Sequence, residues 1–136
     1  MEAGFRITTD IGEIDHDRVW RWMRDESYWD PGRTWDVHER AVAGSRCYAV
    51  LAPDGSTAGF CRVVTDYATF GWLADVVVLP EHRGQGLAKA LVGAVVADPQ
   101  LTAMRRLILG TRDAHGLYEQ FGFVRDQRER FMERLG

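Results

Sequence analysis

The stretch Asp75-Val76-Val77-Val78-Leu79-Pro80-Glu81-His82-Arg83-Gly84-Gln85-Gly86-Leu87-Ala88 decides the fold. The residues from Phe70 to Leu79 are almost wholly apolar, which predicts a central strand buried on both faces, and Pro80 ends it. A stripe of apolar residues at helical spacing follows the glycines: Leu87, Ala90, Leu91, Ala94 and Val95. The chain is therefore expected to run from a buried strand through a glycine loop directly into a helix.

A loop in this position is suited to bind an anion. The free backbone N–H groups and the positive end of the helix dipole face whatever lies above the strand. Gly84 and Gly86 let the backbone approach an oxygen closely, and Arg83 adds a charged donor. The loop lacks the Gly-Lys-Ser/Thr ending of the nucleotide P-loop and the glycine spacing of the dinucleotide fingerprint. A glycine turn that merely joins strand to helix is the alternative interpretation.

The segments around this unit predict an α/β order. Before it we expect a strand at 5–9, a helix from 15 to about 24 capped by Asp15, and a helix at 35–43 capped by Thr34. Strands at 47–51 and 57–65 follow, joined by the turn residues 53–55. After the long helix, which ends at 98–99, we expect a strand at 107–109, a helix at 115–120 and an extended arm at 123–135.

Length and composition limit the function classes. A chain of 136 residues suits one domain, 1–136. The net charge of −3 argues against a nucleic-acid-binding surface, and no apolar run reaches secretory or membrane-spanning length, so a cytoplasmic protein is expected. Cys47 and Cys61 lie in predicted strands and are expected to be free thiols. The four histidines are scattered without paired ligand spacing, so no metal site is predicted.

Three residues of the loop, Arg83, Gly86 and Ala88, match the motif of the GNAT superfamily of N-acetyltransferases, which the chain resembles over nearly its full length. The strand and turn at 75–82 look like the segment before that motif, and 117–123 looks like the closing segment of the family. A further likeness is to small bacterial members with the segment found here at 65–70. The resemblance implies an α/β GNAT fold, whose central mixed, mostly antiparallel twisted sheet has six to seven strands and about four flanking helices.

The resemblance also implies a cosubstrate, acetyl-CoA. The backbone of Val76, Val77 and Val78 would pair with the pantetheine arm, and an N–H there would polarise the acetyl carbonyl. Backbone N–H groups of the loop and first helical turn would hold the pyrophosphate, with Arg83 opening the loop: Gly84, Gln85, Gly86, Leu87, Ala88 and Lys89. Thr111 stands where the family often has Asn, which weakens an amide contact to the cosubstrate, although a hydroxyl could serve.

Two side chains are candidates for proton transfer. By the same resemblance, Tyr118 lies where many members place a tyrosine that protonates the departing thiolate, although a tyrosine on such a helix often packs in the core. Asp75 interrupts an apolar strand, and burial is expected to raise its pKa so that it relays a proton from the amine through water. The alternative for Asp75 is a carboxylate that caps a backbone group. His115 is the second candidate base, with a surface position as its alternative.

The acceptor groove of this fold usually lies against the first two helices and their connection. That region is rich in aromatic residues, of which Tyr28 and Trp29 are the predicted acceptor contacts; Trp20, Trp22 and Trp35 complete the set. Core packing explains some of them equally well. The sequence therefore leaves open whether the acceptor is a small amine, an amino acid, a polyamine or a protein amine.

These observations favour an N-acetyltransferase that moves the acetyl group of acetyl-CoA to a primary amine by direct attack in a ternary complex. The alternative is a non-catalytic acyl-CoA-binding or sensing module that keeps the loop without turnover. Transfer through a cysteine is disfavoured, because neither Cys47 nor Cys61 has a histidine nearby in sequence. The predicted partners are acetyl-CoA and an amine, without nucleic acid or membrane, and a homodimer is left open.

Overall fold

The computed structural model describes residues 1, 3–128 and 130–136. Its strands are β1 (Arg6–Thr8), β2 (Ser45–Leu51), β3 (Thr57–Thr65), β4 (Phe70–Val78) and β5 (Arg106–Ile108). Its helices are α1 (His16–Glu26), α2 (Trp35–Ala43), α3 (Leu87–Ala97) and α4 (His115–Glu119). Two short 3-10 turns, η1 (Ile11–Glu13) and η2 (Pro80–His82), complete the order.

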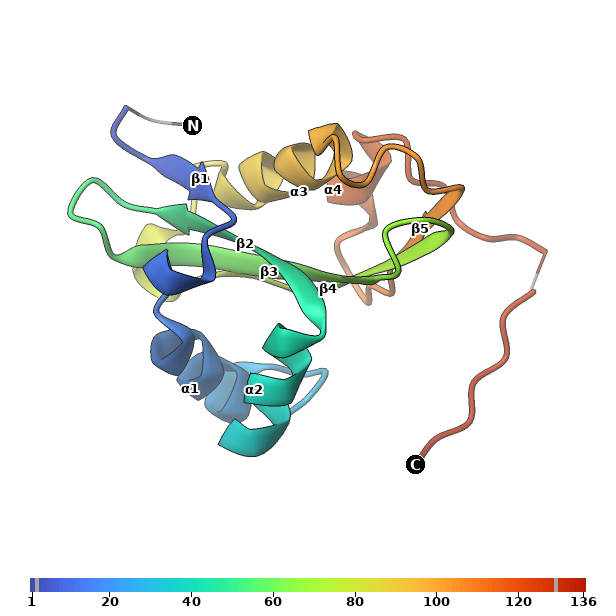
Figure 1. Cartoon of the computed structure of the whole chain (residues 1–136), viewed down its shortest axis with the longest axis horizontal. Coiled ribbons are helices and arrows are strands. Elements are labelled where there is room, and N and C mark those ends of the chain that lie inside the picture. Colours follow the sequence, from blue (N-terminus) through green and yellow to red (C-terminus); the bar gives the residue numbers. More distant parts are fainter. Residues whose placement is uncertain (2, 129) are drawn as a thin grey trace.

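The strands form one sheet in the order β1-β2-β3-β4-β5. The pairs from β1 to β4 are antiparallel, and β5 joins β4 in parallel. Helices α1 and α2 cover one face of this sheet, and α3 and α4 cover the other (Figure 1). The predicted α/β fold with a mixed, mostly antiparallel sheet and four helices is confirmed.

The two N-terminal helices begin where their caps predict. The Asp15 carboxylate accepts a hydrogen bond from the Arg18 N–H at 3.0 Å, and the Thr34 hydroxyl accepts one from the Val37 N–H at 3.3 Å. Each bond satisfies one of the N–H groups that have no partner inside the helix. Short polar side chains therefore define these helix starts from local sequence alone.

The core consists of two apolar layers, one on each face of the sheet. Strand β2 shows why: Tyr48 and Val50 face α3 and α4, whereas Cys47, Ala49 and Leu51 face α1 and α2. Successive side chains of a strand point to opposite faces, so a strand covered on both faces is a continuous apolar run. The same alternation in β4 places Val77 in the α1–α2 layer and both its neighbours, residues 76 and 78, in the other.

The prediction of six to seven strands was wrong in number, because the sheet contains five among the described residues. The segment predicted as an extended arm, 123–135, forms no strand within its described part, 123–128 and 130–135. Its polar residues fold into a local turn instead, in which the Asp126 carboxylate accepts from the Arg128 N–H at 3.3 Å. The apolar side chains beyond stay exposed, Met132 by 98%. Too little apolar surface is buried there to pin a strand to the sheet.

The described residues contain neither a membrane-spanning helix nor a cluster of metal-ligand side chains. None of the helices in this part of the chain has the length and apolar character needed to cross a membrane. Within residues 1, 3–128 and 130–136, no three side chains of the types His, Cys, Asp and Glu lie together as a metal site would require.

Candidate active site

The loop between η2 and α3 exposes backbone N–H groups at the start of the helix. Gly84 has φ +80° and Gly86, the N-cap residue of α3, has φ +75°, a conformation that L side chains rarely adopt. Among the described residues, no side chain caps the helix, and nothing lies within 4 Å of the place where a Cβ of either glycine would stand. The buried side chain of Leu87 anchors the first turn to the sheet. The N–H groups of this turn therefore face open space, as an anion site needs.

The strand before this loop has an open edge. Strand β5 pairs with β4 only from Phe70 to Trp72, so residues 73–78 have no partner strand on that side among the described residues. On the other side, the Leu79 N–H donates to the Ala58 carbonyl at 2.9 Å. In an antiparallel ladder, only every second pair of facing residues is joined by backbone hydrogen bonds, and the residues between turn their N–H and C=O groups the other way.

The direction of the β4 backbone groups follows from that alternation. Leu79 and Val77 turn their polar groups toward β3, so Val76 and Val78 turn theirs toward the open edge. The Arg83 Nε–H donates to the Val78 carbonyl at 3.1 Å, which fits this direction. Of the three valines predicted to contact the pantetheine arm, Val76 and Val78 thus present backbone groups to the gap, and Val77 contributes its side chain.

A bulge distorts β4 at Asp75. The register with β3 shifts between Phe60, opposite Val77, and Arg62, opposite Ala74. Asp75 itself has φ +54°, a left-handed conformation that is uncommon outside glycine but better tolerated by Asp and Asn than by other residues. The bulge bends β4 just before the valines that face the gap.

The predicted rise in the pKa of Asp75 was wrong. Burial of this carboxyl, 5% exposed, does disfavour its charge, but the hydrogen bonds and charges of Arg33 and Arg62 outweigh the burial and lower its pKa to about 2. The arginine nitrogens lie 2.7 to 3.0 Å from the carboxylate oxygens. A carboxylate with so low a pKa is a poor base at neutral pH.

This pKa predicts an acid dependence of stability. Because the pKa of Asp75 is lower in the folded chain than its usual 3.8, the ion cluster stabilises the fold fully above about pH 4 and loses this contribution as the pH falls through about 2. A shift of this size corresponds to about 2 kcal/mol. We expect Asp75→Asn to lower the free energy of unfolding at pH 7 and to flatten its decline between pH 4 and 2, as measured by urea unfolding. An unchanged slope for the variant would contradict this assignment.

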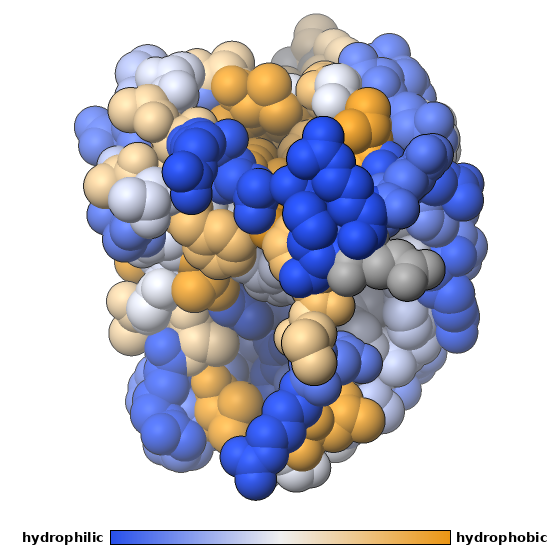
Figure 2. All heavy atoms as spheres, turned by 90° about the vertical axis from the view of Figure 1, so that its right-hand side faces the viewer, coloured by the Kyte–Doolittle hydropathy of each residue, from blue (hydrophilic) through white to orange (hydrophobic). Residues whose placement is uncertain are grey.

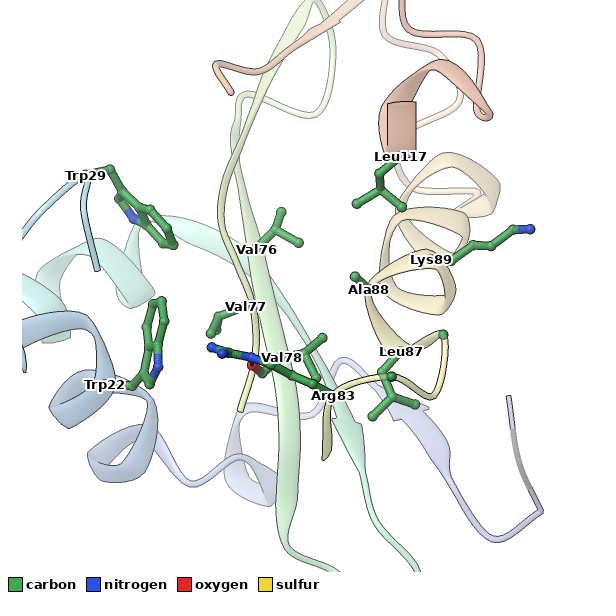
Figure 3. A pocket seen from close by; sticks show the side chains of 12 residues that line it. Trp22, Trp29, Val76, Val77, Val78, Arg83, Leu87, Ala88, Lys89 and Leu117 are labelled. Carbon is green, nitrogen blue, oxygen red and sulfur yellow. Dashed lines mark hydrogen bonds between the residues drawn. The ribbon is translucent and has the colours of Figure 1, made fainter. Parts of the chain in front are cut away.

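The loop, the open edge and an aromatic wall enclose one cavity of about 430 Å³. Its lining contains most of the predicted cosubstrate residues together with three others: Val76, Val77, Val78, Arg83, Gly84, Gly86, Leu87, Ala88 and Lys89, with Trp22, Trp29 and Leu117. Trp22 and Trp29 lie on one side of β4, and Leu117 and α3 lie on the other (Figure 3). The Lys89 side chain points away from the strand, and that of Arg83 reaches toward Trp22.

Comparison with known proteins now defines the family. Residues 16–123 match the model described as the acetyltransferase (GNAT) family. The chain belongs to this family. A GNAT-family protein of Xanthomonas campestris, assigned as an acetyltransferase, is 40% identical, covers 97% of this chain and 93% of its own, and superposes with a TM-score of 0.92.

Two further relatives extend the comparison. An inferred acetyltransferase of Gibberella zeae is 39% identical over 75 residues, which are 52% of this chain and 41% of that protein, so this chain spans only about two fifths of that relative. Spermidine N-acetyltransferase from Vibrio cholerae, solved in complex with CoA and spermine, has a TM-score of 0.72 at 20% identity and covers 92% of this chain and 83% of its own. The likeness to the Vibrio cholerae enzyme concerns the fold alone.

The tyrosine predicted as the acid of this GNAT chain lies outside the first cavity. Tyr118 is 8% exposed, and its hydroxyl has no hydrogen-bond partner among the described residues. Burial raises its pKa to about 12, with smaller contributions from Cys61 and Tyr28. The hydroxyl therefore keeps its proton throughout the neutral range.

A second, larger cavity of about 1620 Å³ adjoins β5, α4 and the C-terminal arm. Tyr118, Thr111 and His115 contribute to its lining. Figure 2 shows this face with apolar and strongly hydrophilic side chains around a hollow. The Thr111 hydroxyl accepts from the Ala114 N–H at 3.0 Å, so it is engaged in the loop before α4. His115 does not line the first cavity.

The aromatic residues before β2 divide into three groups. Trp29 and Trp22 line the first cavity, and the sequence had not distinguished Trp22 from its neighbours. Tyr28 does not line this cavity: its hydroxyl accepts from the Arg112 N–H at 3.3 Å, and the Arg112 guanidinium lies 3.9 Å from the ring centre. Trp20 and Trp35 pack edge to face against each other elsewhere. Helical periodicity could have indicated Trp22, because it shares a face with the buried residues of α1.

The two cysteines are free and buried, as expected. Burial raises the pKa of Cys47 to about 11 and raises that of Cys61 as well, so thiolate is scarce at neutral pH. We expect iodoacetamide at pH 8 to leave both thiols of the native protein unmodified and to alkylate both in urea, as measured by mass spectrometry. Rapid labelling of the native chain would instead support acetyl transfer through a cysteine thiolate.

Proposed function

We propose that the protein is an acetyl-CoA-dependent N-acetyltransferase that acts on a primary amine by direct attack in a ternary complex. The observation that carries this proposal is one cavity that joins the open edge of β4 to the uncapped start of α3. Family membership supports the acetyltransferase class. The complex of the Vibrio cholerae enzyme with CoA and spermine supports the ligand class for a protein of this fold. We further propose that residues 1–136 act as one domain.

The residues around the cavity fit the chemistry of acetyl-CoA. The N–H groups at Gly84, Gly86 and the first turn of α3 would bind the pyrophosphate, which the helix dipole also favours. The edge at Val76 and Val78 would pair with the amide groups of the pantetheine arm, as an added strand would. Arg83 and Lys89 add positive charge on this side, and none of the described residues that line the cavity is acidic.

The proposed transfer needs a neutral amine, a hydrogen-bond donor to the thioester carbonyl oxygen, and an acid. The amine lone pair attacks the thioester carbonyl carbon, forming the C–N bond while the oxygen gains negative charge. An N–H of the open edge, with Val76 the nearest to the bulge, would stabilise that charge. The tetrahedral intermediate then collapses, the C–S bond breaks, and the Tyr118 hydroxyl gives its proton to the leaving sulfur. The proton lost by the nitrogen passes through water to the phenolate and so restores the phenol.

The first test combines binding and turnover on one sample. Calorimetry with acetyl-CoA measures affinity, and thiol release is then followed with phenethylamine, spermidine, L-phenylalanine and a tripeptide with a free N-terminus. Tight binding with release for any of these amines would support the proposal. Tight binding without release would favour the sensing module, and no binding would refute the assignment of the loop.

A further inference from the structure

We propose that Asp75 is a positioning residue that fixes Trp29 as one wall of the cavity and holds the β4 bulge in place, and that it exchanges no proton with the acceptor. This inference rests on the proposed function, because it treats the Trp29 side of the cavity as the acceptor side. It replaces the role as a base that the sequence suggested for this carboxylate.

Every acceptor position of the Asp75 carboxylate is occupied within the protein. Oδ1 accepts from Trp29 Nε1 at 2.8 Å and from Arg33 Nη2 at 3.0 Å. Oδ2 accepts from Arg33 Nη1 at 2.8 Å and from Arg62 Nε at 2.7 Å. A carboxylate offers about four lone-pair positions, so none is left here for a substrate ammonium or a relay water.

The two arginines are themselves held by other groups. Arg33 Nε donates to the Asp30 carboxylate at 2.7 Å, and its Nη1 lies 3.3 Å from His38 Nδ1. Arg62 Nη1 donates to the Ser45 hydroxyl at 3.1 Å. The cluster therefore ties the connection between α1 and α2 to strands β2, β3 and β4. Such a buried hydrogen-bonded network restricts the positions that its members can take.

Trp29 is the member of this cluster that reaches the cavity. The residue is 39% exposed, and its ring lies 5.0 Å from the Tyr28 ring and 5.6 Å from the Trp22 ring, centre to centre. It belongs to the connection between two helices, where no regular backbone fixes its direction. The bond from its Nε1–H to Asp75 therefore selects the rotamer that turns the ring toward β4 in Figure 3.

The same carboxylate also supports the strand that would bind the thioester. The left-handed conformation of Asp75 is unfavourable for most residues and persists only where its surroundings hold it. The bonds to Arg33 and Arg62 supply that restraint, and the following residue, Val76, presents its backbone to the open edge. One side chain thus aligns the acceptor wall with the edge that would bind the donor.

The test compares Asp75→Asn with Trp29→Phe and their double variant. Asn tolerates the left-handed backbone but carries no charge, and Phe keeps an aromatic ring without the N–H group. We expect both single variants to raise the acceptor KM about tenfold, the size of one lost charge-assisted bond, and Trp29→Phe to change kcat and the KM for acetyl-CoA far less. Because both single variants weaken the bond between Trp29 and Asp75, their effects on the acceptor KM should not add in the double variant.

Asp98→Asn is the matched control. Asp98 is also a buried aspartate, bonded to Arg46 at 2.6 Å and to the Tyr48 hydroxyl at 2.6 Å, and it lines neither cavity. This control should lose stability without a change in acceptor KM. Kinetics use whichever of the four panel amines turns over fastest.

A spectroscopic measurement decides the proposal even without turnover, and so separates it from the proposed function. In a ¹⁵N–¹H spectrum, the Trp29 indole resonance, assigned by its loss in Trp29→Phe, should move upfield and exchange faster with solvent in Asp75→Asn. It should stay in place in Asp98→Asn. The proposal would be overturned by an unmoved Trp29 resonance, by additive effects in the double variant, or by loss of the acidic limb of the pH–rate profile at constant acceptor KM.

Discussion

Gly86→Asp is expected to weaken acetyl-CoA binding about 100-fold or more. Gly86 has φ +75° and caps α3 without a side-chain bond, so any substitution strains the start of the helix. The aspartate would also place a negative charge where the pyrophosphate is proposed to lie, and two like charges about 4 Å apart near a protein surface repel by about 4 kcal/mol. Calorimetric titration with acetyl-CoA measures the loss directly.

Gly55→Asp separates the effect on the site from the effect on the backbone. Gly55 has φ +87° in the turn between β2 and β3, and it too has none of the described residues within 4 Å of the place where a Cβ would stand. Gly55→Asp should lower the free energy of unfolding by about 1 kcal/mol, as the same backbone strain does in Gly86→Asp, and leave acetyl-CoA affinity intact. Equal affinities for the two variants would show that the loop before α3 does not hold the pyrophosphate.

The sequence predicts well what local chemistry determines. The caps Asp15 and Thr34 place two helix starts within a residue, because each cap bonds an N–H only three residues away. Gly86 likewise marks the start of α3, since a glycine before an apolar helical stripe can take the left-handed conformation found there. The strand and loop that enclose the first cavity were therefore visible in the sequence.

The environment of Asp75 shows where such reasoning fails. Its apolar neighbours in β4 correctly predict burial, and burial alone would raise the pKa. The groups that reverse the shift are Arg33 and Arg62, 42 and 13 residues away along the chain. No local pattern indicates that an arginine after α1 and another in β3 converge on one carboxylate. Only the packing of α2 and the bulge in β4 brings them together.

The predictions for the aromatic residues and for the C-terminal arm fail for related reasons. Tyr28 and Trp29 are adjacent in sequence, yet only Trp29 lines the first cavity, because Tyr28 is bound to Arg112 of a distant loop. The arm has apolar residues that suit a strand, but a strand needs a partner edge as well as a pattern. Sequence thus predicts which residues can form a wall or a strand, and tertiary contacts decide which of them do.

Tyr118→Phe is expected to lower kcat about 100-fold or more while leaving acetyl-CoA affinity within about twofold. The substitution removes only the hydroxyl, which has no partner among the described residues, and the ring can keep its edge contact with Phe123. The proton needed by the leaving sulfur would then have to come from water. Because the pKa of Tyr118 is raised to about 12, the phenol stays protonated and no alkaline decline below about pH 10 should arise from it.

Tyr48→Phe is the control for this variant. Tyr48 is a second buried tyrosine of the same core layer, its hydroxyl donates to Asp98 at 2.6 Å, and it lines neither cavity. Loss of the Tyr48 hydroxyl should reduce stability more than loss of the Tyr118 hydroxyl, because it removes a buried hydrogen bond. It should leave turnover unchanged, because that bond lies away from the site. If the Tyr118 variant turned over at the wild-type rate, another proton source would serve the sulfur. If both variants slowed equally, the effect would belong to the core and not to catalysis.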